Sequence, residues 1–92
     1  MKLLSVSVSP LKTKKYRAFF DDNTHTDFGY AGMSDYTQHH DKKRRDNYLS
    51  RHRANEDWNN PKSAGSLSRW ILWGDSESIH TNIRAFKKKF NS

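Results

Sequence analysis

Cysteine is absent from this sequence, and several classes of protein are excluded with it. A chain without cysteine has no disulfide scaffold, no thiol nucleophile and no zinc finger with cysteine ligands. The absence fits a reducing compartment, and we expect a protein that is not secreted. The apolar N-terminal stretch is interrupted by Ser5, Ser7 and Ser9, so it is too short for a signal peptide or a membrane span.

Aliphatic residues are also scarce, because all hydrophobic residues together make up only 33% of the chain. That fraction alone is typical of disorder. However, three Trp, four Tyr and five Phe are present, and each aromatic side chain can bury about 150–250 Å². The 92 residues therefore predict one small folded domain, residues 1–92, with a thin core. A homodimer would enlarge the buried area, and that alternative stays open.

Acidic residues are few relative to basic ones. Lys and Arg number 17 against 10 Asp and Glu, which gives a net charge of +7 and a pI of about 9.9. Such an excess of positive charge favours a polyanionic partner, either nucleic acid or an acidic membrane. Because the chain is so poor in apolar residues, we expect nucleic acid, with DNA favoured, and no membrane.

The N-terminal third has the pattern of a small antiparallel sheet. Alternating apolar and small polar residues predict a strand over residues 3–8. An aromatic-rich strand is predicted over 14–20 and a returning strand over 24–28, joined by a turn of Asp and Asn residues. One face of the first strand is expected to carry Leu4, Val6 and Val8.

Residues 34–53 contain neither Gly nor Pro and predict one long basic helix. It is expected to begin at Ser34 as its N-cap and to dock through Tyr48 and Leu49, with Tyr36 assisting. Asp41 and Arg45 stand at the i, i+4 spacing that allows an ion pair within the helix.

Two shorter helices are predicted after a loop over residues 54–60. The first would begin with Asn60 as N-cap and Pro61 at the first helical position, and its buried face would carry Leu67, Trp70 and Ile71. The second would be capped by Asp75 or Ser76. Its apolar stripe comprises Ile79, Ile83, Phe86 and Phe90. The fold class is thus α+β, a small antiparallel hairpin or sheet followed by a long basic helix and two shorter helices.

Three clusters of basic residues are candidates for contacts with phosphates. They lie before and within the second strand, on the long helix and at the end of the last helix. The candidate nucleic-acid-binding residues are Lys12, Lys14, Lys15, Arg17, Lys42, Lys43, Arg44, Arg51, Arg53, Arg84, Lys87, Lys88 and Lys89. Tyr16, Phe19 and Phe20 stand among the first cluster and could stack on bases, but the thin core is expected to need them more.

Catalytic chemistry has little support in the sequence. The five histidines have no zinc-site spacing, and no phosphate-binding glycine loop or nucleophile elbow occurs. The hairpin followed by His39, His40, Asn47 and His52 is distantly similar to a hairpin–helix metal nuclease, yet the ordered spacing of such a site is missing. We expect no enzyme, no metal, no cofactor and no small-molecule substrate.

Several short motifs occur together in one order along the chain. They are Lys14-Lys15-Tyr16-Arg17-Ala18, Thr26-Asp27-Phe28-Gly29, Asp35-Tyr36-Thr37-x-His39, Arg51-His52-Arg53, Pro61-x-Ser63-Ala64-Gly65-x-Leu67-Ser68, Ile71-Leu72-Trp73-Gly74 and Asn82-Ile83-Arg84. Together they resemble, over residues 14–90, an uncharacterised family of short basic proteins of nucleocytoplasmic large DNA viruses. The resemblance implies a viral protein located in the virion and in the cytoplasm or nucleus of the infected cell. It supplies no catalytic residues, and residues 1–13 look particular to this chain.

The function that these features favour is non-enzymatic binding of nucleic acid, with DNA favoured, through phosphate contacts and largely independent of sequence. Packaging or organisation of a viral genome would fit the resemblance. The alternative is a protein–protein adaptor that binds an acidic partner, and a metal-dependent nuclease ranks third.

Overall fold

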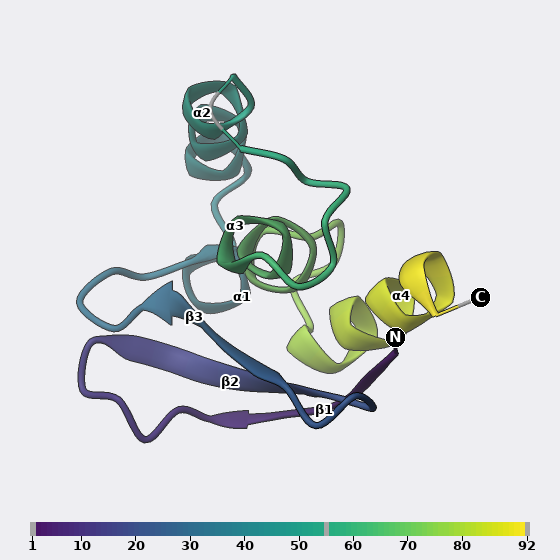
Figure 1. Cartoon of the computed structure of the whole chain (residues 1–92). Coiled ribbons are helices and arrows are strands. Elements are labelled where there is room, and N and C mark those ends of the chain that lie inside the picture. The colour runs from purple at the N-terminus through teal and green to yellow at the C-terminus, as the bar shows by residue number, and fades with distance from the viewer. Residues whose placement is uncertain (1, 55, 92) are drawn as a thin grey trace.

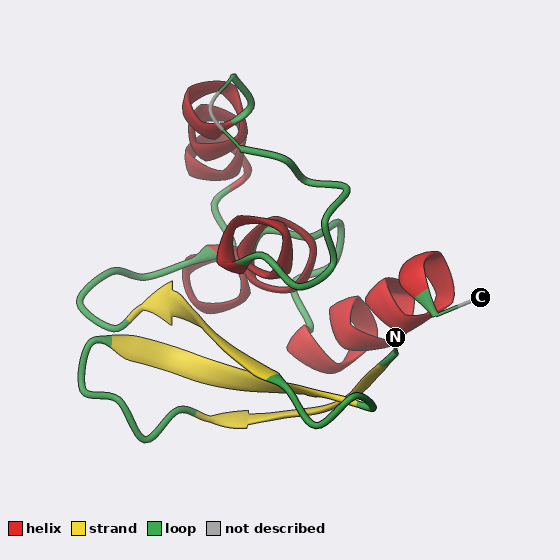
Figure 2. Cartoon of the chain, in the orientation of Figure 1, coloured by secondary structure: helices red, strands yellow, loops and turns green. Residues whose placement is uncertain are grey.

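The structure is a computed structural model that describes residues 2–54 and 56–91. It is an α+β fold in which one face of an antiparallel sheet is covered by helices (Figure 1). The strands, in the spatial order β1-β2-β3, are β1 (Leu3–Val8), β2 (Lys14–Phe20) and β3 (His25–Tyr30). The helices are α1 (Tyr36–His39), α2 (Lys42–His52), α3 (Ala64–Leu67), the π-helical turn η1 (Ser68–Leu72) and α4 (Ile79–Phe90) (Figure 2). The predicted fold class is confirmed.

The turn between β2 and β3 has the chemistry that its Asp and Asn residues predict. Asn23 adopts a positive φ of 66°, and the backbone N–H of Thr24 donates to Asp22 Oδ1 over 3.2 Å. The Asp22 carboxylate also pairs with Lys62, and these contacts lower its pKa to about 2. β3 begins one residue later than predicted and ends two residues later, at Tyr30. Gly29 within it has a φ of 80°, which glycine adopts without the strain of a side chain.

The first strand differs from the prediction that its even-numbered apolar residues share a face. Leu3 pairs with Phe20 and Ser5 with Phe19, so the strand is bulged at Leu4. A bulge shifts the alternation of side chains by one residue. Leu3 therefore faces the core and is 2% exposed, whereas Leu4 is 55% exposed.

The predicted long helix over residues 34–53 is wrong, because the chain breaks it into α1 and α2. His40 adopts the left-handed conformation, with a φ of 57°, and closes α1. Asp41 then begins a new helix, and its carboxylate accepts hydrogen bonds from two backbone N–H groups of α2. Asp41 is therefore not the partner of Arg45, which instead forms an ion pair with Asp75 at 2.8 Å.

The helix starts also differ from the predicted caps. α1 is capped by Asp35 rather than Ser34, and α3 by Ser63 rather than Asn60. α4 is capped by Ser78 rather than by Asp75 or Ser76. Each observed cap is a short polar side chain that accepts a hydrogen bond from a backbone N–H in the first turn, as N-caps do.

The core lies between the inner face of the sheet and the helices α3, η1 and α4. Phe28, Leu72 and Phe86 are at most 1% exposed there. Phe20 is buried and Tyr16 packs against the same core, as predicted. Phe19 is the exception, because it is 37% exposed.

A buried amide joins the last two helical segments. The Asn82 side chain donates to the carbonyl groups of Ile71 and Ser76, at 2.9 and 2.8 Å, and accepts from the backbone N–H of Ser76. These bonds attach α4 to the end of η1.

No helix among residues 2–54 and 56–91 combines the length and the apolar character that crossing a bilayer requires.

Candidate nucleic-acid interface

A groove of about 910 Å³ separates α2 from β3 and from the loop over residues 31–35. One face of α2 forms its first wall. Ser50 also lines the groove, but the other residues on this wall recur at i, i+3, i+4, i+7 and i+8, which is the spacing of one helix face. They are Arg44, Asn47, Tyr48, Arg51 and His52.

The second wall comes from the sheet and from the loop that follows it. Lys14 at the start of β2 and Tyr30 at the end of β3 pair across the two strands. Tyr30 is 63% exposed and Met33 in the loop is 59% exposed. This wall therefore offers a cation, an aromatic ring and a thioether to whatever enters the groove.

Small residues form the floor, which is built by α3 and η1. Ala64, Gly65 and Ser68 line it together with Leu72 and Trp73. A Cβ atom at Gly65 would lie 2.9 Å from Glu56 Oε2, so a larger residue there would displace the end of the Glu56 side chain. Three of these five floor residues, Ala64, Gly65 and Ser68, have small side chains that take up little of the groove.

Stacked rings position α2 above this floor. The ring of Tyr48 lies parallel to that of Trp73, with centroids 4.1 Å apart and an angle of 3° between the planes. His52 stacks on the other side of Tyr48 at 4.2 Å and is within hydrogen-bond distance of Glu56, 2.8 Å. Burial raises the pKa of Tyr48, so its hydroxyl stays protonated at neutral pH.

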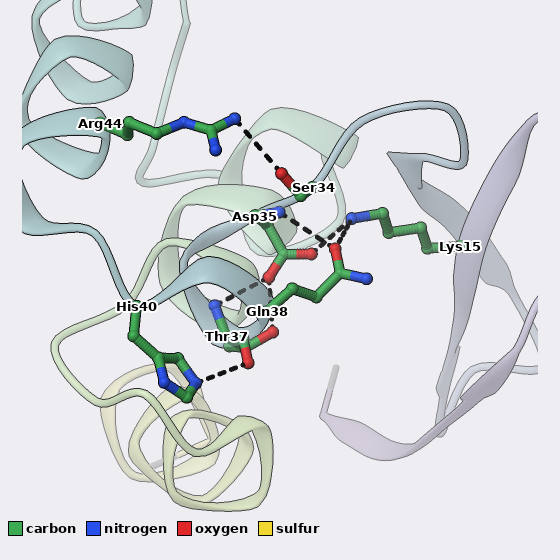
Figure 3. Close-up of polar contacts among 7 residues, drawn as sticks. All are labelled: Lys15, Ser34, Asp35, Thr37, Gln38, His40 and Arg44. Atoms are coloured by element: carbon green, nitrogen blue, oxygen red, sulfur yellow. Dashed lines mark hydrogen bonds and ion pairs between the residues drawn. The ribbon is translucent and has the colours of Figure 1, made fainter.

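Asp35 organises the loop of the second wall (Figure 3). Its carboxylate forms an ion pair of 2.6 Å with Lys15 and accepts from the backbone N–H of Thr37. In return, the Gln38 side chain accepts from the backbone N–H of Asp35, which completes a capping box. Asp35 is only 3% exposed where it lines the groove, and its carboxylate is paired with Lys15.

The groove brings together three of the cations that the sequence singled out, Lys14, Arg44 and Arg51. None of the three forms an ion pair with another described residue. Arg44 donates from Nη2 to Ser34 Oγ over 3.2 Å, which spans the two walls at one end. Two acids also line the groove. Asp35 forms an ion pair with Lys15, and Glu56 accepts a hydrogen bond from the indole N–H of Trp58 and lies within hydrogen-bond distance of His52, so neither carboxylate pairs with the three cations. The lining therefore carries three cations, Lys14, Arg44 and Arg51, against two acids.

Two of the predicted phosphate-binding residues are neutralised within the protein. Lys15 is paired with Asp35, and Arg17 contacts both oxygens of Asp27 at 2.9 and 3.1 Å. The Arg17 guanidinium lowers the pKa of Asp27, which keeps this pair ionised. The residues next to Lys15 and Arg17 in the sequence do not reveal these ion pairs, because the acidic partners come 20 and 10 residues later.

The remaining predicted residues lie outside the groove. Lys12 is in the exposed loop between β1 and β2, and Lys42, Lys43 and Arg53 are exposed around α2. α4 packs on η1 and β1 and is well separated from α2 in Figure 1. Its basic residues therefore form a second positive surface, which comprises Arg84, Lys87, Lys88 and Lys89.

Sequence reasoning missed Tyr30, Met33 and Asn47 as groove residues. Asn47 could have been found, because it stands midway between Arg44 and Arg51 at the spacing of one helix face. Tyr30 and Met33 carry no such signal.

In residues 2–54 and 56–91, no three His, Asp or Glu side chains come together as a metal site.

His39 makes stability sensitive to pH at the junction of α1 and α2. Its Nδ1 accepts from the backbone N–H of Asp41 over 2.9 Å, and its ring lies 5.3 Å from that of Trp73. Burial, with a further contribution from Arg44, lowers the pKa of His39. As the pH falls, His39 therefore becomes protonated in the unfolded chain before it does so in the folded protein. The stability contributed by neutral His39 is complete above about pH 6.5 and is lost as the pH falls through the folded pKa.

Urea unfolding between about pH 7.5 and pH 5 measures this loss. The variant His39→Gln retains an acceptor for the Asp41 N–H but cannot titrate. We expect its free energy of unfolding to decline less over this range than that of the wild-type chain. An equal decline in both proteins would show that His39 is not the group responsible.

A comparison with protein families identifies the N-terminal part of the chain. The model of a family of unknown function, DUF5754, matches residues 4–52, just over half of the chain. The match covers β1 to α2 and so includes most of the N-terminal segment that we expected to be particular to this chain. It does not extend over residues 53–90, where the sequence also suggested a resemblance. No curated protein and no solved structure matches the chain.

Proposed function

The chain belongs to DUF5754, a family of unknown function, and we propose that it binds nucleic acid without enzymatic activity, through phosphate contacts at the groove between α2 and β3. DNA is the favoured partner, and binding depends little on base sequence. The single observation that carries this proposal is the convergence of Lys14, Arg44 and Arg51 from two separate segments on one groove, with no acidic partner among the described residues.

Phosphate is the anion that this arrangement suits. Arg44 and Arg51 lie seven residues apart, which is two turns and about 10 Å along a helix. Duplex DNA carries one phosphate per about 3.4 Å along each strand, so the two guanidinium groups can reach different phosphates of one strand. Guanidinium groups also donate two parallel hydrogen bonds to a phosphate. Contacts of this type position a nucleic acid without reading its sequence.

An acidic protein is the second candidate partner, and the positive surface on α4 favours it. Arg84, Lys88 and Lys89 are exposed there and lie apart from the groove. A folded acidic partner could contact this surface without occupying the groove.

The resemblance to short basic proteins of large DNA viruses adds a biological setting to the first candidate. In that setting we propose that the chain organises or packages a viral genome in the virion.

A salt-titrated binding assay with paired charge variants tests the proposal. The double variant Arg44→Gln/Arg51→Gln removes two phosphate contacts from the groove. We expect its affinity for DNA of any sequence to fall by about tenfold or more. The slope of log K against log salt, measured from about 50 to 300 mM, should lose nearly two units in magnitude.

The matched control is Lys88→Gln/Arg84→Gln, which changes the net charge equally but on α4. It should reduce affinity and slope much less. An equal loss in both double variants would show that net charge, and not the groove, governs binding. If the wild-type chain binds neither DNA nor RNA at 50 mM salt, the proposal fails and an acidic protein partner becomes the better candidate.

A further inference from the structure

We propose that the groove between α2 and β3 holds an unpaired nucleotide, so that the chain prefers single-stranded nucleic acid over duplex. This inference rests on the proposed function and specifies its substrate class. Three features support it together: the size of the groove, the cations on both of its walls and an exposed aromatic ring.

The size of the groove is the first argument. Its volume of about 910 Å³ is within the range of about 300–1,000 Å³ that small-molecule sites occupy. Duplex DNA keeps its bases stacked inside and offers proteins only its backbone and the base edges in its grooves. The duplex could contact the cations at the rim, but it would leave the cavity empty. A single strand can turn a base out of its own stack and fill the cavity.

The exposed ring of Tyr30 is the second argument. Tyr30 is 63% exposed at the end of β3, and its ring stacks on no other described aromatic side chain. By contrast, Tyr48 on the opposite wall has both faces covered, one by Trp73 and the other by His52. Tyr30 is therefore the aromatic surface of the groove that remains available to a base.

The arrangement of charges and polar groups supports the same occupant. Lys14 pairs with Tyr30 across β2 and β3, so a cation and a free ring lie side by side on one wall. Arg44 and Arg51 face them from α2. A phosphate and its attached base need this combination of cation and ring, and single-strand-binding proteins use it. An apolar peptide would leave the cations unmatched.

The selectivity of the groove for base edges is expected to be weak. Asn47 lines the groove and can donate and accept one hydrogen bond each with a base edge. Stacking on Tyr30 is available to every base, because each base has a π-face. The inference therefore agrees with binding that depends little on sequence.

Fluorescence anisotropy with labelled oligonucleotides of equal length tests this inference. The probes are oligo-dT, an abasic strand with the same number of phosphates, a duplex and a single-stranded RNA. We expect oligo-dT to bind at least tenfold more tightly than the duplex and clearly more tightly than the abasic strand. The abasic strand separates the contribution of the base from that of the phosphates.

Tyr30→Ala should reduce the affinity for oligo-dT about five- to 140-fold, the range that loss of one stacked base predicts. Its affinity for the duplex and for the abasic strand should change little, and Tyr30→Phe should retain binding. The matched control is Phe19→Ala, which removes another exposed aromatic ring outside the groove. This control should bind all four probes as the wild-type chain does.

The failure of this inference can be told apart from that of the proposed function. Equal affinities for oligo-dT and duplex, with a steep salt dependence, would overturn the preference for single strands but leave phosphate binding intact. A Tyr30→Ala variant with unchanged affinity for oligo-dT would also overturn the inference. Absence of binding to all four probes would refute both, and binding of poly-glutamate alone would indicate an acidic protein partner.

Discussion

Replacing Trp73 with alanine is expected to lower the free energy of unfolding by about 3–5 kcal/mol, the usual cost of truncating a large buried aromatic side chain. Trp73 is 8% exposed, and its ring contacts the rings of Tyr48 in α2 and His39 in α1. Its loss would leave a cavity where these two helices meet η1. Because α2 forms one wall of the groove, nucleic-acid binding should weaken together with stability.

Urea unfolding followed by far-UV circular dichroism measures this effect. Trp73→Phe is the matched control, because phenylalanine retains a ring that can stack on Tyr48. It should cost well under half as much as the alanine variant. If Trp73→Ala lowers the free energy of unfolding by less than about 1 kcal/mol, which is no more than a typical substitution costs, then the ring stack does not hold α2 in place.

Replacing Asp35 with alanine is expected to cost about 3 kcal/mol, the low end of the range for removing one partner from a buried ion pair. The substitution leaves the Lys15 ammonium, whose side chain is 12% exposed, without its carboxylate. It also removes the N-cap of α1 and the hydrogen bond from the backbone N–H of Thr37. The loop over residues 31–35, which forms part of the second wall of the groove, should lose its fixed conformation.

Asp41→Ala is the matched control for this variant. Asp41 also caps a helix through its carboxylate, but it is exposed and forms no ion pair with a described residue. Its loss should cost about 1 kcal/mol, the usual value for an N-cap. Thermal unfolding of both variants at neutral pH gives the comparison. Equal losses of stability would mean that the Lys15–Asp35 pair contributes nothing beyond the cap.

The candidate site could be predicted only in part. The basic residues of α2 are apparent from composition and helical spacing, and three predicted cations do line the groove. Their neutralised neighbours, Lys15 and Arg17, could not be recognised, because their acidic partners are distant in the sequence. Tyr30 could not be placed either, because exposure at a strand end depends on what packs over the strand.

Local pattern was enough to predict the α+β class, the three strands and the apolar faces of the last helices. These features depend on side-chain periodicity and turn chemistry, which act between residues close together in the chain. The break at His40 and the bulge at Leu4 were not predictable, because a left-handed residue or an inserted strand residue is stable only where its neighbours pack to suit it. The groove itself belongs to the tertiary structure alone. It exists because Trp73 stacks on Tyr48 and Asp35 pairs with Lys15, and contacts of this kind form only after the chain has folded.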